Sequence, residues 1–268
     1  MTKISLITAC FNSDKTVRDT INSVNIQTYP DIEHIVVDGA SRDRTVEIAK
    51  ELATRNPVIV SEPDKGIYDA YNKGLGLATG EIIGFINSDD FYIDRDVIAE
   101  VMAVFEDPSV QGCYSDLVYV SPGDTNKVER VWKSKLLTAA DFRRGLIPAH
   151  PTVFLRREVY EKYGDFDLSF KLAADYEFLL RLFYAAGIKA RYVPRVWVRM
   201  RSGGATGQNL KSIARQNGEI RLAQQKHAMT CSRLVFFVTK VIDRSLQKLR
   251  APFFSPGRAK EEAVQGSR

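Results

Sequence analysis

The chain has 268 residues, of which 44% are hydrophobic and 26% are charged, enough to bury one large core. It contains no run of about 18 or more apolar residues and no signal-peptide pattern, so we expect a cytoplasmic protein. The three cysteines are far apart and odd in number, which argues against a disulfide framework or a zinc site.

The net charge of +5 is unevenly distributed along the chain. Residues 230–260 hold seven Lys or Arg and one Asp, so the basic character belongs to the C-terminal tail. The rest of the chain gives no reason to expect a nucleic-acid partner.

The first hundred residues alternate between two kinds of pattern. Short, apolar, β-prone runs occupy residues 4–11, 32–41, 57–64 and 81–90. Stretches with apolar residues at helical spacing follow them, with Asn12, Ser13 or Asp14 and then Ser41 or Asp43 as candidate helix caps. This alternation predicts an α/β fold, a Rossmann-like, mostly parallel sheet with helices on both faces and ligands at the carboxyl edge of the strands.

The second half reads as mixed structure. We expect a helix over 97–108, two antiparallel strands around the turn at 122–126, and a helix near 138–145. A strand-like stretch follows over 150–164, then a helix over 173–187 closed by Gly187, and a helical tail from about residue 208. The whole is predicted to be one α/β domain with this tail.

Polar residues gather where the predicted strands end. Thr8 and Asn12 follow the first strand, Asp38 the second, and the adjacent pair Asp89 and Asp90 the fourth. One interpretation of the pair is a simple turn after a buried strand. The other is a site for Mg²⁺ or Mn²⁺, because carboxylates that converge on one crevice repel each other without a cation between them.

Several segments in order resemble one family. ITACFN, VVDGASRDRT, EPDKGIYDAYNKGL, GFINSDD and the HPTVFLRREVYEKYGDFD and AADYEFLLR segments resemble inverting family 2 glycosyltransferases with the GT-A fold, over residues 3 to about 205. The resemblance implies a catalytic domain over 1–207, with a nucleotide-sugar-binding half at 1–110 and an acceptor and catalytic-base half at 111–207. A basic amphipathic tail at 208–268 follows.

The resemblance also implies roles for single residues. The nucleotide base would lie against the ends of the first two strands, the ribose and diphosphate beside the helix that starts near residue 66, and the metal at Asp89 and Asp90. Asn87 stands where many relatives carry another Asp. For the helix near residue 66 the alternative is a solvated surface face. The expected donor-binding set is Thr8, Cys10, Asn12, Asp38, Asp69, Asn72, Lys73, Asp89 and Arg201.

Asp175 is the candidate catalytic base, since inverting transfer needs one group to take the proton of the acceptor hydroxyl. On a helix over 174–186 it lies in line with Phe178 and Leu182, and from the residues alone a helix cap explains it equally well. Only the resemblance favours catalysis. Glu177 lies about 200° away around the helix. The resemblance places Glu177 and His150 with the acceptor, and the alternative for His150 is a structural histidine before a proline.

Two features remain open at the C-terminal end. Arg199 and Arg201 precede the glycine-rich segment 201–209, which is either a lid over the diphosphate or a linker. Residues 234–250 form a basic amphipathic helix that either contacts an anionic membrane peripherally, on its inner face, or packs against the body or a second subunit as a homodimer.

We therefore expect a metal-dependent inverting glycosyltransferase that uses Mn²⁺ or Mg²⁺. It would move one sugar from a nucleotide-diphosphate sugar to a hydroxyl of a saccharide or lipid-linked acceptor in cell-envelope polysaccharide or glycolipid synthesis. UDP is favoured because Asp38 fits uracil or thymine at least as well as guanine. The alternatives are a non-catalytic sugar-nucleotide-binding module and a sugar-nucleotide pyrophosphorylase. The second requires a glycine-rich loop after the first strand, and ITACFNSDKT has no glycine.

Overall fold

The computed structural model describes residues 1–203 and 210–254. Within these residues one sheet has the order β3-β2-β1-β4-β8-β6-β9-β5, and β7 pairs with β6 outside this path. The strands are β1 Ile4–Cys10, β2 Ile32–Asp38, β3 Val58–Ser61, β4 Ile82–Phe85, β5 Phe91–Tyr92, β6 Gly112–Ser121, β7 Asp124–Trp132, β8 Phe154–Arg156 and β9 Ala190–Arg201.

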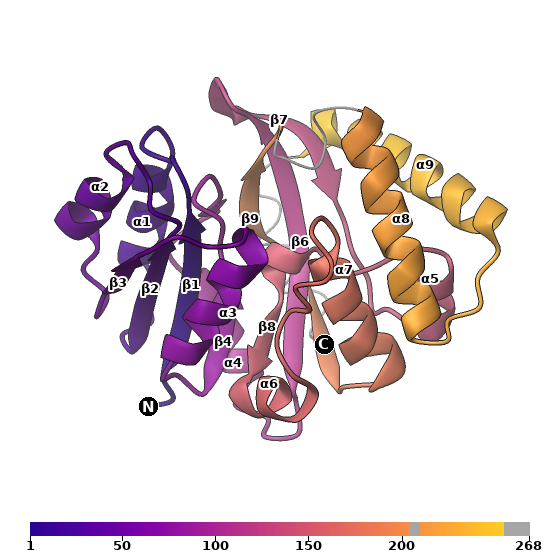
Figure 1. The fold of residues 1–268 in the computed structure, drawn as a ribbon, viewed down its shortest axis with the longest axis horizontal. Coiled ribbons are helices and arrows are strands. Elements are labelled where there is room, and N and C mark those ends of the chain that lie inside the picture. The colour runs from indigo at the N-terminus through magenta and orange to yellow at the C-terminus, as the bar shows by residue number, and fades with distance from the viewer. Residues whose placement is uncertain (204–209, 255–268) are drawn as a thin grey trace.

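The helices flank this sheet (Figure 1). They are α1 Val17–Asn25, α2 Thr45–Leu52, α3 Ile67–Leu77, α4 Val97–Val104, α5 Ala139–Arg143, α6 Arg157–Tyr163, α7 Ala174–Leu179, α8 Leu210–Lys226 and α9 Arg233–Arg250. A π-helical turn at Leu180–Ala185 continues α7, and 3-10 turns occupy His150–Thr152 and Ala251–Phe253.

The N-terminal half of the sheet is parallel. Strands β3, β2, β1 and β4 run side by side in one direction, and every residue of β1 and β2 is buried. Strands of this kind lose their alternating pattern because helices cover both faces of the sheet. Alternate residues therefore enter different cores: Ile7 and Ile35 pack with α3, whereas Leu6 and Ile32 pack with α4. The predicted α/β fold is confirmed.

The second half of the sheet is mixed. Strand β8 is antiparallel to both β4 and β6, and β9 runs parallel to β6. The predicted strand over 150–164 is wrong beyond β8, because Val159 and Tyr160 belong to helix α6 and face the core. Strand β9 was not predicted. Pro194 interrupts its pattern, and the β6–β9 register shifts there, from Ser115 opposite Val193 to Asp116 opposite Val196.

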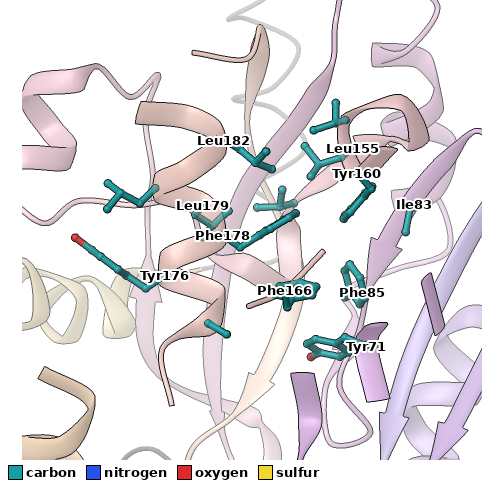
Figure 2. Packing of buried hydrophobic residues seen from close by; sticks show 14 of the residues in the cluster. Tyr71, Ile83, Phe85, Leu155, Tyr160, Phe166, Tyr176, Phe178, Leu179 and Leu182 are labelled. Carbon is teal, nitrogen blue, oxygen red and sulfur yellow. The ribbon is translucent and has the colours of Figure 1, made fainter. Parts of the chain in front are cut away.

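An aromatic core joins the two halves. Phe85 from β4, Phe166 from the loop after α6 and Phe178 from α7 pack together, with ring centroids 5.4 Å apart for Phe85 and Phe166 and 4.5 Å for Phe166 and Phe178. Figure 2 shows Tyr71 of α3 beside Phe85 and Phe166 at the end of this cluster, whereas Tyr176 points away from it. This cluster holds α3 and α7 at a fixed separation across the sheet edge.

The C-terminal helices extend the same body. On α8, Ile220 and Ala223 join the aromatic core, and the carboxylate of Glu219 accepts hydrogen bonds from the backbone N–H groups of Leu172 and Ala173 at 2.7 and 3.0 Å. Helix α9 follows and lies along β7. The helices over 1–203 and 210–254 include none that is long and apolar enough to cross a bilayer.

We expect Gly84→Ala to destabilise the protein. A Cβ atom on Gly84 would lie 2.3 Å from the buried ring of Phe154 on the neighbouring strand, so the core must shift, with an expected loss of about 1–3 kcal/mol in the free energy of unfolding. Urea denaturation measures it. The control Gly76→Ala, where a Cβ meets nothing within 4 Å, should be neutral or stabilising by about 0.5–1 kcal/mol. Equal effects of the two changes would contradict the packing argument.

Candidate active site

Asp38 ends β2 as a fully buried, fixed carboxylate. Its Oδ2 atom accepts hydrogen bonds from the backbone N–H of Ser41 at 2.9 Å and from the hydroxyl of Ser61 at 2.6 Å, and the Ser41 hydroxyl donates to Oδ1. A Cβ on the adjacent Gly39 would lie 2.4 Å from the Asp64 carboxylate, so glycine permits a close approach there. The carboxylate of Asp64 thus lies against the backbone next to Asp38.

The loops after β1 and β2 are joined to each other. The side-chain oxygen of Asn12, a residue with a φ of +50°, accepts from the backbone N–H of Arg42 at 2.9 Å. The backbone N–H of Ser13 donates to the hydroxyl of Thr45 at 2.7 Å. The expectation that residues 12–14 cap α1 is therefore wrong, because these residues bind the neighbouring loop and α1 begins after Thr16 without a side-chain cap.

Thr8 and Cys10 lie in the core beneath the edge. The hydroxyl of Thr8 is 3.0 Å from Nε2 of His34 on β2, and both residues are fully buried. Cys10 packs with Val17 and Val36, and burial followed by the charge of Asp38 raises the pKa of its thiol. The structure does not bring the side chain of Thr8 to the edge with Asp38.

The two carboxylates that follow β4, Asp89 and Asp90, differ in their exposure to solvent. Asp89 is partly exposed, whereas Asp90 is fully buried. Oδ2 of Asp90 accepts from the side-chain amide of Asn87 at 2.8 Å and Oδ1 from the backbone N–H of Arg201 at 3.2 Å. Burial raises the pKa of both carboxyls, and the charge of Asp89 raises that of Asp90 further. Asn87, in place of a third carboxylate, thus supplies a donor to the pair.

Arg201 provides the positive charge beside this pair. Its guanidinium donates to the backbone carbonyl of Asp89 at 2.6 Å, pairs with Asp19 of α1, and lies 5.1 Å from the ring of Phe91. Its charge lowers the pKa of Asp89 and of Asp90, which offsets part of the effect of burial. Arg201 therefore lies beside the acidic pair, and its side chain is buried in contacts that fix the loop after β4. Its contact with the donor stays a prediction.

Two tyrosines of α3 connect the acidic pair to Asp175. The hydroxyl of Tyr68 donates to Oδ1 of Asp175 at 3.0 Å, and that of Tyr71 donates to Oδ1 of Asn87. Burial raises the pKa of Tyr71, and the charges of Asp90, Asp175 and Asp89 raise it further, so all three carboxylates lie within electrostatic reach of one ring. Sequence reasoning missed both tyrosines, although their i, i+3 spacing on a predicted helix is a signal for a shared face.

The other predicted residues of α3 stabilise its surroundings. The carboxylate of Asp69 accepts from the backbone N–H of Lys65 at 3.0 Å. The amide of Asn72 forms two hydrogen bonds with the backbone of Phe166, at 2.9 and 3.0 Å. Lys73 donates to the carbonyl of Pro63 at 2.8 Å and pairs with Glu62. These side chains are engaged in holding the loops around the site.

Asp175 lies in the first turn of α7 and is partly exposed. The N-cap residue of this helix is Ala173, so the interpretation of Asp175 as the N-cap is wrong. Besides the hydroxyl of Tyr68, the backbone N–H of Tyr176 donates to Oδ1 at 2.8 Å. Both known donors thus bind one oxygen, and they fix the orientation of the carboxylate.

The ring of His150 packs against three aromatic rings near Asp175. Its ring centroid lies 5.5 Å from that of Phe166, 5.6 Å from Phe85 and 5.8 Å from Tyr71. Burial lowers the pKa of His150, and the charge of Asp175 raises it in part. The ring is therefore held neutral at pH 7, beside the candidate base.

Glu177 lies on another side of α7, as the helical period predicts. It is fully buried and accepts from Lys226 at 2.8 Å, His227 at 2.8 Å and Arg181 at 3.2 Å. These partners come from α7 itself and from the end of α8. The structure does not bring Glu177 to the site, because it lies enclosed in this ion-pair cluster, and Arg181 pairs with it rather than with Asp175.

The donor atoms at the acidic pair suit a hard divalent cation. Over the described ranges, 1–203 and 210–254, no group of three or more His, Cys, Asp or Glu residues could enclose a metal ion. Mg²⁺ and Mn²⁺ need only one or two protein carboxylates when water and phosphate oxygens supply the other ligands. Asp89 and Asp90 fit that mode of binding. The predicted lid at 201–209 falls mostly on residues 204–209, outside the described residues.

Solved structures identify the fold class. The chain matches S. aureus TarS 1–349, solved with UDP-GlcNAc, over 84% of this chain and 66% of that one, with a TM-score of 0.67 and 20% identity. It matches the mannosyltransferase PcManGT of Pyrobaculum calidifontis, solved with GDP-Man and Mn²⁺, over 99% of this chain and 80% of that one, with a TM-score of 0.61 and 18% identity. The fold is the expected GT-A type.

Sequence comparison then identifies the family. The model of glycosyl transferase family 2 matches residues 5–164. A PGL/p-HBAD biosynthesis glycosyltransferase of Mycobacterium bovis is 31% identical over 195 residues, covering 70% of this chain and 73% of the relative. An uncharacterized glycosyltransferase of Mycobacterium tuberculosis is 34% identical over 181 residues, covering 66% and 68%. The chain belongs to glycosyl transferase family 2 and is a nucleotide-sugar-dependent glycosyltransferase, so the pyrophosphorylase alternative is wrong.

The buried histidine beneath the edge makes stability depend on pH. Burial lowers the pKa of His34 to about 4, below its value of about 6.5 in an unfolded chain. The unfolded state therefore binds more protons between these values, and stability falls by about 3 kcal/mol as the pH drops from 7 to 4. His34→Gln should flatten this dependence in urea unfolding measured across that range. His150 is present in both proteins, and an unchanged pH profile in the variant would show that His34 is not responsible.

Proposed function

We propose that this enzyme transfers a single sugar, with inversion, from a nucleotide-diphosphate sugar to an acceptor hydroxyl. One observation carries the proposal: Tyr68 and Tyr71 of α3 bind Asp175 on one side and Asn87 of the acidic-pair loop on the other. A proposed base and a proposed metal-binding pair that are both connected to one face of one helix suit a reaction in which the acceptor is deprotonated while the diphosphate departs.

The donor is proposed to be a UDP-sugar. Asp38 is a fixed acceptor group at the end of β2, and a carboxylate can accept from the imide N–H of uracil in addition to its present donors. TarS was solved with UDP-GlcNAc and PcManGT with GDP-Man, so the fold accommodates more than one base. Cys10, Asn12, Asp69 and Lys73 remain proposed neighbours of the donor.

The metal is proposed to be Mn²⁺ or Mg²⁺. Asp89 is the accessible ligand of the pair, and Asp90 lies behind it, oriented by Asn87 and the backbone of Arg201. When bound, such an ion neutralises the charge that develops on the departing diphosphate. The raised pKa values of the two carboxyls are consistent with a site that gains stability when a cation shares their charge.

Asp175 is proposed to take the proton of the acceptor hydroxyl as its oxygen attacks the anomeric carbon. Tyr68 and the backbone of Tyr176 hold one carboxylate oxygen, so the other can face the acceptor. The neutral ring of His150 is partly exposed and packs on the buried ring of Phe166, so an acceptor sugar ring could pack against His150. The products are the glycosylated acceptor and a nucleoside diphosphate, and no covalent intermediate is needed.

We further propose a saccharide or lipid-linked acceptor in the synthesis of cell-envelope polysaccharide or glycolipid. The support is the mycobacterial relative, which is described as a PGL/p-HBAD biosynthesis glycosyltransferase. This relative is 31% identical over 70% of this chain, and the acceptor itself is to be identified by assay.

Asp89→Asn should remove metal-dependent donor binding. Calorimetric titration with UDP and with GDP, each with and without Mn²⁺, should show binding by the parent protein that is at least about tenfold tighter with metal, because a divalent ion held by Asp89 and Asp90 would share its charge with the diphosphate. The variant should lose this difference. Glu51→Gln on exposed α2 is the matched control and should bind like the parent. Metal-enhanced binding by Asp89→Asn would remove Asp89 from the proposed site.

Asp175→Asn should keep donor binding and lose transfer. The amide has nearly the shape of the carboxylate but cannot accept a proton, and general-base catalysis typically contributes about 10²–10⁴-fold to a rate. Transfer is followed as release of nucleoside diphosphate with a panel of acceptors, beside a titration of donor affinity. Asp165→Asn, an exposed carboxylate outside the proposed site, should leave both unchanged. A variant with near-normal turnover would require another base.

A further inference from the structure

Helix α9 is amphipathic in the opposite sense to an ordinary surface helix. The side chains that face the body of the protein are mainly polar, and Gln247 is the most buried of them, with 2% exposed. The side chains that face solvent are mainly apolar. Their exposed fractions are 72% for Leu234, 66% for Phe237, 43% for Val238, 49% for Val241, 54% for Ile242, 42% for Leu246 and 67% for Leu249.

These exposed residues form one continuous surface. Leu234, Val238, Val241, Ile242 and Leu249 recur at the i, i+4, i+7 spacing that places side chains on one side of a helix, and we call them the apolar stripe of α9. Phe253, 81% exposed, follows in the next turn of chain. Figure 1 shows α9 at the outer edge of the molecule, beside α8.

The polar side of α9 holds the helix in this orientation. Gln247 donates to the carboxylate of Asp243, whose pKa is raised by burial, and Lys240 donates to the side chain of Asn217 on α8 at 3.4 Å. The one aromatic residue on this side, Phe236, packs against Gly145. Turning the stripe inward would break these contacts and would leave Phe236 in solvent. Within residues 1–203 and 210–254 the stripe is therefore uncovered and accessible to a partner.

The charge of α9 indicates which partner fits. The helix contains five Lys or Arg and one Asp, and the exposed Arg244 and Lys248 lie beside the stripe. Two copies of this helix packed stripe to stripe would bring like charges together. An anionic bilayer surface instead offers hydrocarbon to the stripe and phosphate groups to the cations, whose long side chains reach the headgroups while the helix lies in the interface.

We propose that the apolar stripe of α9 docks this enzyme onto an anionic membrane surface, with α9 lying in the plane of the interface. The position of the proposed active site suggests why docking would help the enzyme, an argument that rests on the proposed function. Burial and then the charge of Arg244 lower the pKa of Lys240, whereas the charge of Asp175 raises it in part, so the inner side of α9 faces toward the proposed base. A docked α9 would hold Asp175 near the headgroups, where a lipid-linked acceptor presents its hydroxyl.

The test is binding of the full chain to vesicles without any sugar nucleotide. Sedimentation with vesicles of phosphatidylcholine alone, and of phosphatidylcholine with phosphatidylglycerol, should show binding to the anionic vesicles that is weaker at high salt. This assay measures no turnover. Vesicle binding can therefore fail while transfer to a soluble acceptor persists, and transfer can fail while vesicle binding persists. Failure of this inference is thereby distinguishable from failure of the proposed function.

Two pairs of substitutions separate the apolar and ionic contributions. Ile242→Asn with Leu249→Asn keeps the charge and should weaken vesicle binding at least about tenfold, because two apolar side chains no longer enter the interface. Arg244→Gln with Lys248→Gln should weaken binding to anionic vesicles by about 25-fold, since each cation near such a surface contributes about fivefold. Ile26→Asn at the end of α1, 57% exposed in the other half of the molecule, is the matched control and should bind like the parent.

Light scattering and urea unfolding complete the experiment. All of the substituted residues are exposed, so the unfolding midpoint should stay near that of the parent protein. Loss of vesicle binding at an unchanged midpoint supports the proposal. Absence of vesicle binding by the parent, or parent-like binding by Ile242→Asn with Leu249→Asn, overturns it. A dimer of the parent that this variant dissociates, with vesicle binding unchanged, would assign the stripe to a second copy instead.

Discussion

The repulsion between Asp89 and Asp90 is the constraint around which the edge of the sheet is organised. Two carboxylates at the end of a buried strand are unfavourable unless their environment supplies donors and positive charge. Asn87 and the backbone of Arg201 supply donors, and the guanidinium of Arg201 supplies charge. Since Arg201 also pairs with Asp19, the arrangement draws together β4, the last residue of β9 and the first turns of α1. The chemistry proposed for the enzyme and its tertiary structure therefore share the same contacts.

Most of the polar side chains around the site already have hydrogen-bond partners within the protein. Asn72, Lys73 and the guanidinium of Arg201 hold backbone groups of neighbouring loops, and Asp38 already receives three donors. Such saturation keeps a polar pocket in one conformation, because each displaced side chain would leave buried groups without partners. The partly exposed carboxylates Asp89 and Asp175 differ from this pattern, which agrees with their proposed roles toward ligands.

The sequence predicted the parallel half of the fold well, because strands buried on both faces and amphipathic helices leave clear patterns. It failed where tertiary contacts override local ones. Strand β9 carries Pro194 at a register shift, and residues 157–163 are helical although their apolar residues are β-prone. Candidate roles followed from residue type, but whether Thr8 reaches the edge or Glu177 the acceptor depends on which side chains enclose them. The spacing of residues along the sequence does not show which side chains will enclose them in the fold.

Helix α3 fixes the angle between the two tyrosines that connect Asp175 with the loop of the acidic pair. Tyr68 and Tyr71 reach their separate partners only because they are three residues apart on one rigid helix. Inserting one residue between them would rotate one tyrosine by about 100° relative to the other and disconnect one partner, whereas the loop at residues 53–57 could absorb the same insertion. Natural length variation among proteins that keep this bridge should therefore collect in the loops before α3 and leave the helix itself unchanged in length.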